Sequence, residues 1–310
     1  MNTKAKGYIY GSIAAITYGM NPLFTLPLYA DGMNPDSVLF IRYLMALVIL
    51  GIMIRWRGRN LRIQRKDILP LAGVGLLMAC SSLFMFLSFL YIDAGVASTL
   101  LFVYPILVAL IMAIFYKERL TLPTATSIVL ALGGIGLLYR GENGVALNFT
   151  GVILVMISAL TYALYMVMVN RPRLREIPTV KLTFYVILFG LSVFLLRVDF
   201  GTSVCLPQHW YHWGNLLALA LLPTAISFVA TTRSVQYIGS TPTAILGALE
   251  PVTALFFGVT VFDERITVRI ASGVALIIIA VTLIVAGGSI TSYLVRFRKM
   301  FPKLRKKKSA

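Results

Sequence analysis

The chain has 310 residues, of which 59% are hydrophobic and only 13% are charged, and its mean hydropathy is +0.87. This composition excludes an ordinary soluble domain and predicts an all-α polytopic membrane protein. The net charge of +17 is high enough for nucleic-acid binding. The basic residues lie between apolar stretches, however, and this pattern indicates orientation in a membrane, with no nucleic-acid partner.

Ten apolar stretches are long enough to cross a hydrocarbon layer of about 30 Å as helices. We therefore predict ten transmembrane helices. In chain order they lie near Gly7–Ala30, Val38–Ile54, Ile68–Tyr91, Ala94–Tyr116, Thr124–Tyr139, Phe149–Val169, Val180–Leu196, Gly214–Tyr237, Ser240–Phe262 and Thr267–Gly287.

Most basic residues lie in every second connection between the predicted helices, and therefore on one side of the membrane. If both ends of the chain lie inside, 23 of the Lys and Arg residues are on the inner side and five on the outer side. The positive-inside rule therefore predicts an even number of spans with both termini in the cytoplasm. Orientation explains the basic cytoplasmic tail, residues 291–310, and contact of this tail with anionic lipid headgroups is compatible with it.

The chain contains an internal repeat. A shift of 146 residues lays Tyr91–Thr121 on Tyr237–Thr267, with the tyrosine, the proline and the Glu-Arg pair in register. We predict two five-helix repeats, residues 1–145 and 146–290. Because each repeat has an odd number of spans, the second is inverted relative to the first. Inverted repeats are typical of alternating-access carriers, whose substrate site lies near the midplane between the halves.

The ninth stretch carries one charged residue, Glu250, near its middle. A carboxylate at this depth costs about 2.5–3.5 kcal/mol and so marks a candidate site, although a packing role is the alternative. Pro251 cannot donate a helical hydrogen bond, so we expect a free carbonyl at Gly247 and a bend in the helix. In the fourth stretch, Pro105 matches this proline and Tyr104 takes the place of the glutamate.

Aromatic and amide side chains provide further candidates for substrate binding. Tyr18 and Asn21 are one turn apart in the first stretch, beside Pro22, which we expect to disturb the helix. Tyr162 and Tyr165 repeat this spacing in the sixth stretch. The alternative for each pair is helix packing or an interfacial position.

The remaining polar candidates are arginines and histidines. Arg42 lies near the outer end of the second stretch, and we expect it to snorkel to headgroups rather than contact substrate. Arg233, in the eighth stretch, is a candidate to attract an anionic substrate or to pair with a carboxylate. His209 and His212 have a spacing that suits a metal, but the sequence shows no third ligand, so we expect no metal site and no cofactor.

Several segments resemble EamA-type carriers of the drug/metabolite transporter superfamily. The segments are ALTYALYMVMV, TLLFVYPILVALIMAIFYKERLT and AILGALEPVTALFFGVTVFDERIT. The resemblance implies a bacterial inner-membrane carrier of ten spans in two repeats. It also implies recurrent roles for an arginine and a Glu-Pro pair, matched here by Arg42 and by Glu250 with Pro251. The first stretch departs from the family's Trp-Gly pattern by carrying Tyr18 and Gly19.

We therefore expect a secondary transporter, an exporter of small metabolites, amino acids or drugs. Because burial disfavours a charged carboxylate, Glu250 is a candidate for proton coupling; alternatively it stays charged and binds a substrate ammonium. An uptake carrier or a pH-independent facilitator or exchanger is the alternative function. An enzyme is disfavoured because the spans contain no histidine and a single mid-depth carboxylate. The expected partners are the substrate, lipids and protons, and a homodimer is left open.

Overall fold

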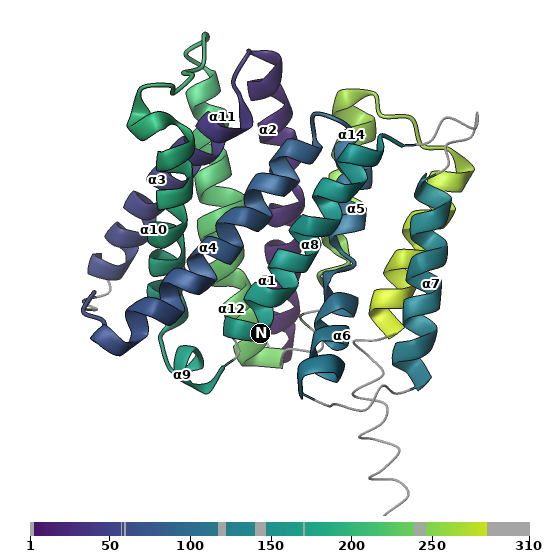
Figure 1. The fold of residues 1–310 in the computed structure, drawn as a ribbon, viewed down its shortest axis with the longest axis horizontal. Helices are drawn as coiled ribbons and strands as arrows, with labels where there is room; N and C mark the ends of the chain where they lie inside the picture. The colour runs from purple at the N-terminus through teal and green to yellow at the C-terminus, as the bar shows by residue number, and fades with distance from the viewer. Residues whose placement is uncertain are drawn as a thin grey trace, which may run out of the picture.

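A computed structural model gives the fold of the protein. It describes residues 3–56, 58, 60–116, 122–139, 147–169, 171–238, 243 and 246–283. Within these residues every regular element is a helix and none is a strand (Figure 1). The predicted all-α class is confirmed.

The helices follow the predicted apolar stretches closely. Their bounds are α1 Thr3–Gly19, α2 Asn21–Ala30, α3 Pro35–Trp56, α4 Arg65–Ser88, α5 Ala94–Leu101, α6 Tyr104–Tyr116, α7 Leu122–Tyr139, α8 Phe149–Val169, α9 Pro172–Arg175, α10 Thr179–Arg197, η1 Asp199–Gly201, α11 His212–Ala220, η2 Leu221–Ile226, α12 Ser227–Ile238 and α14 Leu249–Phe262. A last helix, without a label, spans Val268–Leu283. The basic tail lies outside the described residues.

Six helical segments in the described part of the chain are long and apolar enough to cross a membrane, and three further apolar helices are shorter. Many large apolar side chains are exposed on them, for example Ile52, Ile114 and Leu132, each more than half exposed. Such a surface suits lipid rather than water. The protein is therefore a multi-pass membrane protein, while the count of ten spans and the inverted repeat stay predictions.

Three of the predicted stretches are broken near their middle. A turn at Met20 separates α1 from α2, and residues 102–103 separate α5 from α6. A turn also precedes α14. In each case a proline follows within the first three residues of the next helix. Proline is tolerated there because the first backbone N–H groups of a helix have no intrahelical acceptor.

The break before α14 corrects one expectation. The backbone N–H of Glu250 donates to the carbonyl of Gly247 at 3.0 Å, so this carbonyl is not free. The chain tightens into a three-residue turn and recovers the hydrogen bond that Pro251 cannot make. The polar character of this region therefore comes from the glutamate side chain rather than from an open carbonyl.

The helices pack in recurring pairs (Figure 1). Helix α1 packs on α12, and α4 packs on α8. Helix α5 contacts α14, and α3 contacts α10. At one edge of the molecule α7 packs closely on Val268–Leu283, since a Cβ on Gly134 would lie 2.9 Å from the carbonyl oxygen of Gly273.

One close contact of a glycine with an isoleucine occurs twice, at residues about 145 positions apart. A Cβ on Gly7 in α1 would lie 2.4 Å from the Ile238 side chain, and a Cβ on Gly151 in α8 would lie 2.7 Å from Ile92. Both glycines allow a neighbouring helix to approach, as small residues do at membrane helix interfaces.

A hydrogen bond recurs in the same way. Ser81 Oγ in α4 donates to the carbonyl of Ser158 in α8 at 3.1 Å, and Ser227 Oγ in α12 donates to the carbonyl of Ala14 in α1 at 3.0 Å. Each donor and each acceptor of the first bond therefore has a counterpart in the second, 146 and 144 residues away.

Candidate functional site

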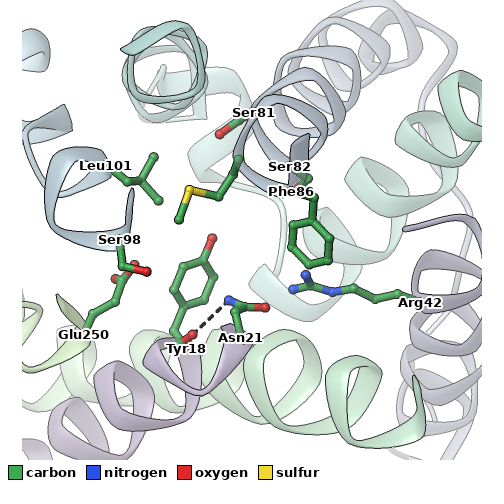
Figure 2. Close-up of a pocket in the computed structure, with 10 residues that line it drawn as sticks. Tyr18, Asn21, Arg42, Ser81, Ser82, Phe86, Ser98, Leu101 and Glu250 are labelled. Atoms are coloured by element: carbon green, nitrogen blue, oxygen red, sulfur yellow. Dashed lines mark hydrogen bonds between the residues drawn. The ribbon is translucent and has the colours of Figure 1, made fainter. Parts of the chain in front are cut away.

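A small buried cavity lies where the three helix breaks approach one another. Its volume is about 20 Å³, which is room for about one water molecule. Helices α1, α2, α3, α4, α5 and α14 contribute its walls (Figure 2). The lining residues are Tyr18, Asn21, Arg42, Ser81, Ser82, Met85, Phe86, Ser98, Leu101 and Glu250.

Glu250 forms one wall of this cavity. It is the second residue of α14, and its backbone lies against α1 at Gly19, where a Cβ would come within 2.5 Å of the Glu250 carbonyl oxygen. Only glycine allows this close approach of the two backbones. The approach brings Tyr18, the residue before Gly19, to the same cavity. Among the described residues the Glu250 carboxyl makes no ion pair.

Arg42 forms the opposite wall, and the expectation that it snorkels to headgroups is wrong. Its side chain is only 5% exposed, its Nε donates to Thr224 Oγ1 at 3.2 Å, and its guanidinium lies 5.3 Å from the centre of the Phe86 ring. A hydroxyl acceptor and an aromatic face hold the cation inside the protein. Figure 2 shows Arg42 and Glu250 reaching the cavity from opposite sides.

The acceptor for Arg42 depends on an irregular helix. Thr224 lies in η2, a single π-helical segment between α11 and α12. Its hydroxyl donates to the Leu219 carbonyl at 3.0 Å, so its lone pairs remain for the arginine. Such π-helical turns are frequent at functional sites because the wider turn redirects a side chain.

Tyr18 and Asn21 lie between the two charged walls, as Figure 2 shows. The Asn21 amide nitrogen donates to the Tyr18 carbonyl at 2.8 Å across the break between α1 and α2. Its Oδ1 atom is buried and has no partner among the described residues. An unsatisfied buried acceptor favours a donor from a water or a ligand.

The other three predicted tyrosines form an aromatic row rather than the cavity wall. The rings of Tyr104 and Tyr162 meet edge to face at 4.7 Å, and those of Tyr162 and Tyr165 stack at 5.7 Å. Tyr165 is 5% exposed and packs in an apolar cluster with Leu71 and Val186. This row joins α6 to α8. The three tyrosines therefore have the helix-packing role that was the alternative to substrate binding.

Arg233 does not belong to the cavity lining. Its side chain is exposed on α12, and the arginine that does line the cavity is Arg42. The predicted breaks at Pro22, Pro105 and Pro251 coincide with the helix interruptions already described, and Gly247 lies in the turn before α14.

The sequence alone did not show that Ser81, Ser82 and Ser98 line the cavity. Ser82 lines the cavity and also shares a hydrogen bond of 2.9 Å with Tyr43. Ser81 serves both purposes, because its hydroxyl also bonds α8. The available signal was the presence of serines in two otherwise apolar stretches, which identifies polar side chains without showing which face they occupy.

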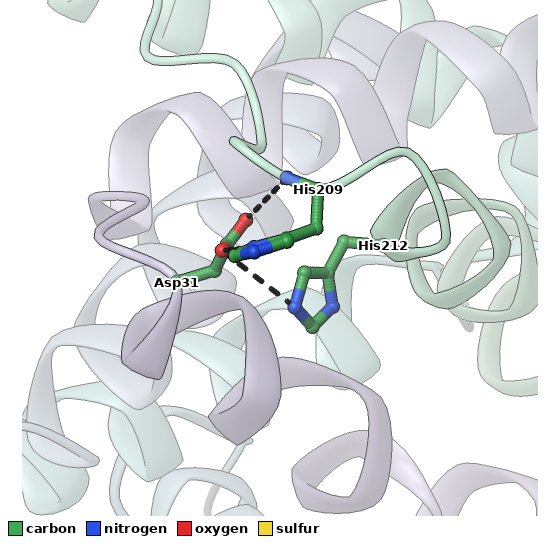
Figure 3. A group of neighbouring side chains, drawn as sticks. All are labelled: Asp31, His209 and His212. Atoms are coloured by element: carbon green, nitrogen blue, oxygen red, sulfur yellow. Dashed lines mark hydrogen bonds and ion pairs between the residues drawn. The ribbon is translucent and has the colours of Figure 1, made fainter.

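A second polar cluster corrects the reasoning about His209 and His212. The third side chain that the sequence did not reveal is Asp31, which lies at the end of α2 (Figure 3). The carboxylate and both imidazoles lie within 4.8 Å of one another. Asp31 is 178 positions from His209 in the chain, and it meets the two histidines through the packing of α11 on α2.

The fold and the cavity define a multi-pass helical membrane protein with a buried polar site. The model of the EamA-like transporter family matches residues 5–140 and again residues 149–286, so the chain belongs to this family. A transporter of Archaeoglobus fulgidus, named only as uncharacterized, is 27% identical over 88% of this chain and 96% of its own length. The Bacillus subtilis protein named uncharacterized transporter YxxF is 23% identical over 71% of each chain.

One solved crystal structure has the same fold. It matches with a TM-score of 0.65 and 18% identity over 94% of this chain and 99% of the other. The family and these relatives identify the chain as a membrane transporter.

Proposed function

We propose that the protein is an alternating-access exporter of small zwitterionic metabolites, amino acids foremost, in the bacterial inner membrane. The observation that carries this proposal is the pairing of Glu250 and Arg42 on opposite walls of one buried cavity. A carboxylate suits a substrate ammonium, and a guanidinium suits a substrate carboxylate in two-point contact. Hydroxyls and an amide line the space between them, as specific small-ligand sites require.

The repeated helix contacts support two inverted five-helix repeats, residues 1–145 and 146–290. The bond from Ser81 to Ser158 has its counterpart from Ser227 to Ala14, and the close approach at Gly7 has its counterpart at Gly151. Such paired contacts are expected where two copies of one fold exchange equivalent neighbours across an axis in the membrane plane.

The size of the cavity supports alternating access. A space of about 20 Å³ is far smaller than the several hundred Å³ of ordinary ligand pockets. A substrate therefore enters only after the helices move. The breaks beside Pro22, Pro105 and Pro251 lie next to the cavity and are the proposed positions of that movement.

The distribution of charge supports cytoplasmic termini. One end of the molecule has a hollow of about 270 Å³ near α9, and its basic lining residues are Arg62, Lys66, Arg173 and Lys181. The connection from α2 to α3, which lies between Asp31 after α2 and Asp36 in the first turn of α3, is at the opposite end (Figure 1). By the positive-inside rule the basic end faces the cytoplasm.

Coupling to protons is the finer part of the proposal. Among the described residues Glu250 has no cationic partner that would fix its charge. In an apolar surrounding such a carboxyl exchanges between charged and neutral forms when water reaches it from either side. Exchange of one proton inward for one substrate outward then uses the proton gradient.

Transport by purified protein in liposomes tests both parts. Labelled amino acids and related zwitterions are offered with and without an imposed pH gradient, using wild type, Glu250→Gln and the matched control Glu176→Gln, whose exposed side chain directly follows α9. Gradient-driven accumulation should be lost in Glu250→Gln alone. Gradient-independent transport in all three proteins would instead identify a facilitator or exchanger, and inward accumulation would identify an uptake carrier. A panel in which no zwitterion moves would reject the proposal.

A further inference from the structure

Asp31, His209 and His212 have an arrangement that no step of the proposed transport uses. His209 Nδ1 lies 2.5 Å from Asp31 Oδ1, and His212 Nε2 lies 3.8 Å from the same oxygen. Figure 3 shows both imidazoles directed at the carboxylate. The cluster is far from the cavity, at the end of the molecule where α2 and α11 meet.

The carboxylate is held firmly in this position. Its side chain is 3% exposed, and its second oxygen, Oδ2, accepts the backbone N–H groups of Gln208 at 2.8 Å and His209 at 3.3 Å. Asp31 therefore presents its other oxygen, Oδ1, in a fixed position to the two imidazoles.

His212 is oriented by a neighbour in its own helix. Its Nδ1 atom lies 2.9 Å from the side-chain amide of Asn215. The amide atom placed there is Nδ2, and the nitrogen and oxygen of an amide are interchanged by a half-turn; with the amide turned over, its oxygen accepts a hydrogen bond from Nδ1–H and the Nε2 lone pair is directed at the cluster. A hydrogen-bonded second ring nitrogen is the usual support of a histidine metal ligand.

Two imidazole nitrogens and a carboxylate oxygen form the ligand set of many Zn²⁺ sites, in which a water takes the fourth position. Tetrahedral ligands at about 2.0–2.2 Å from an ion lie roughly 3.4 Å apart. The 2.5 Å contact between Asp31 and His209 must therefore open, and the wider separations, which are within 4.8 Å, must close, by shifts on the order of 1 Å. His209 is 57% exposed, so its ring can turn away from Asp31 to make room and solvent can reach the ion. We propose that Asp31, His209 and His212 bind a divalent transition-metal ion of the Zn²⁺ type.

Such an ion joins the two parts of the chain that the family model matches. Asp31 belongs to the match over residues 5–140, and both histidines belong to the match over residues 149–286. Because the ligands come together only in the folded protein, metal binding stabilises the fold against unfolding. Zn²⁺ should therefore raise the melting temperature, Tm, as well as bind with fixed stoichiometry.

The test is Zn²⁺ titration of the full chain in lipid nanodiscs, after removal of any affinity tag. His209 and His212 are the only histidines in the chain, so they are the only source of imidazole. We expect one Zn²⁺ per chain and a rise in Tm. Each of Asp31→Asn, His209→Gln and His212→Gln should weaken binding by at least about tenfold and abolish the Tm rise.

The matched control is Asp199→Asn, which removes an exposed acid from the connection between α10 and α11. Asp199 has a φ of 48°, which asparagine tolerates, and its binding of Zn²⁺ should equal that of wild type. His209→Gln keeps the test decisive if a buried variant misfolds, because this side chain is exposed. Equal Zn²⁺ binding or an equal Tm rise in His209→Gln and wild type would overturn the proposal and leave only adventitious metal.

Discussion

The segments around Tyr104 and Glu250 are alike in backbone and different in chemistry. In both, a short turn leads into a new helix that starts at or just before the residue that precedes a proline. One break presents a phenol whose ring packs on Tyr162, and the other presents a carboxyl that lines the cavity. The comparison teaches that two similar turns beside a proline can carry different chemistry, because the side chain before the proline differs while the backbone does not.

The same contrast holds for the second charge of the cavity. Arg42 lies in α3, and shifts of 144 and 146 residues lead to Val186 and Leu188 in α10, both apolar. The cation thus belongs to one matched region and the acid to the other. The two regions share their packing contacts and divide the charged groups between them.

The largest expected effect comes from replacing the side chain before each proline, Glu250 or Tyr104. Glu250→Gln should reduce pH-gradient-driven accumulation to background, because an amide cannot carry a proton through the cycle. Tyr104→Phe should change transport by at most about tenfold, since it removes one neutral hydroxyl worth about 0.5–1.5 kcal/mol. Initial rates of labelled substrate in liposomes measure both. Equal losses in the two variants would show that the breaks are equivalent in function.

Arg42 provides the next effect. Arg42→Gln removes a buried charged donor, which is worth about 1.5–3 kcal/mol, so substrate affinity should fall by about 10–100-fold. The control is Arg233→Gln, which removes an exposed arginine from α12 and should leave affinity unchanged. Competition binding with a fixed labelled substrate measures both values. A larger loss of affinity in Arg233→Gln than in Arg42→Gln would show that Arg233, the candidate from the sequence, binds the substrate.

The close helix contacts should respond equally in the two regions. Gly7→Ala and Gly151→Ala each place a methyl group within 2.4–2.7 Å of an isoleucine side chain, so each should lower the free energy of unfolding by about 1–3 kcal/mol. Gly214→Ala is the control because its added Cβ meets no atom within 4 Å. Denaturant unfolding in micelles gives the three values. A large cost at only one of the two contacts would contradict their equivalence.

The recurrent hydrogen bond predicts a smaller effect. Ser81→Ala and Ser227→Ala each remove a hydroxyl that bonds a carbonyl of the neighbouring helix, at a cost of about 1 kcal/mol in the free energy of unfolding. Ser81 also shares a bond of 3.1 Å with the Ser158 hydroxyl, so its replacement should cost slightly more. The same unfolding assay measures both. Ser192→Ala, which removes a local bond on an exposed face of α10, is the control.

The smallest effect concerns Glu264, whose carboxylate accepts the backbone N–H groups of Ala94 and Gly95 at the start of α5. Desolvation and the charge of Asp93 raise its pKa, and the two backbone bonds only partly offset this. Folding therefore favours the protonated form, and stability should fall as pH rises from the ordinary glutamate range through the raised pKa. Glu264→Gln should flatten this part of a Tm-against-pH curve. An unchanged slope in the variant would assign the pH dependence to another group.

Much of the fold was predictable because hydropathy and length identify membrane helices directly. The ends of α8 agree with the predicted stretch Phe149–Val169, and the break before α6 follows from Pro105. Pro251 also indicated an irregular turn, although the hydrogen bond that closes it on Gly247 could not be predicted from the proline alone.

The site was less predictable because sequence position gives depth in the membrane but not the face of a helix. Glu250 was identified because a lone acid is costly in lipid wherever it points. Arg42 was misplaced because its long side chain can reach either the headgroups or the interior, and only the position of Thr224 decides between them. The meeting of Asp31 with His209 depends on helix packing alone, which no local pattern in the sequence reports.

The bond between Arg42 and Thr224 has a consequence for biogenesis. Thr224 follows Arg42 by 182 residues, and at about 5–20 residues per second it is synthesised some 9–36 s later. During that time the arginine lacks its acceptor, and its place two turns from the start of α3 lets it reach the headgroups by snorkelling. We therefore expect a headgroup contact of Arg42 only in the incomplete chain, before the second half supplies the Thr224 hydroxyl as its acceptor.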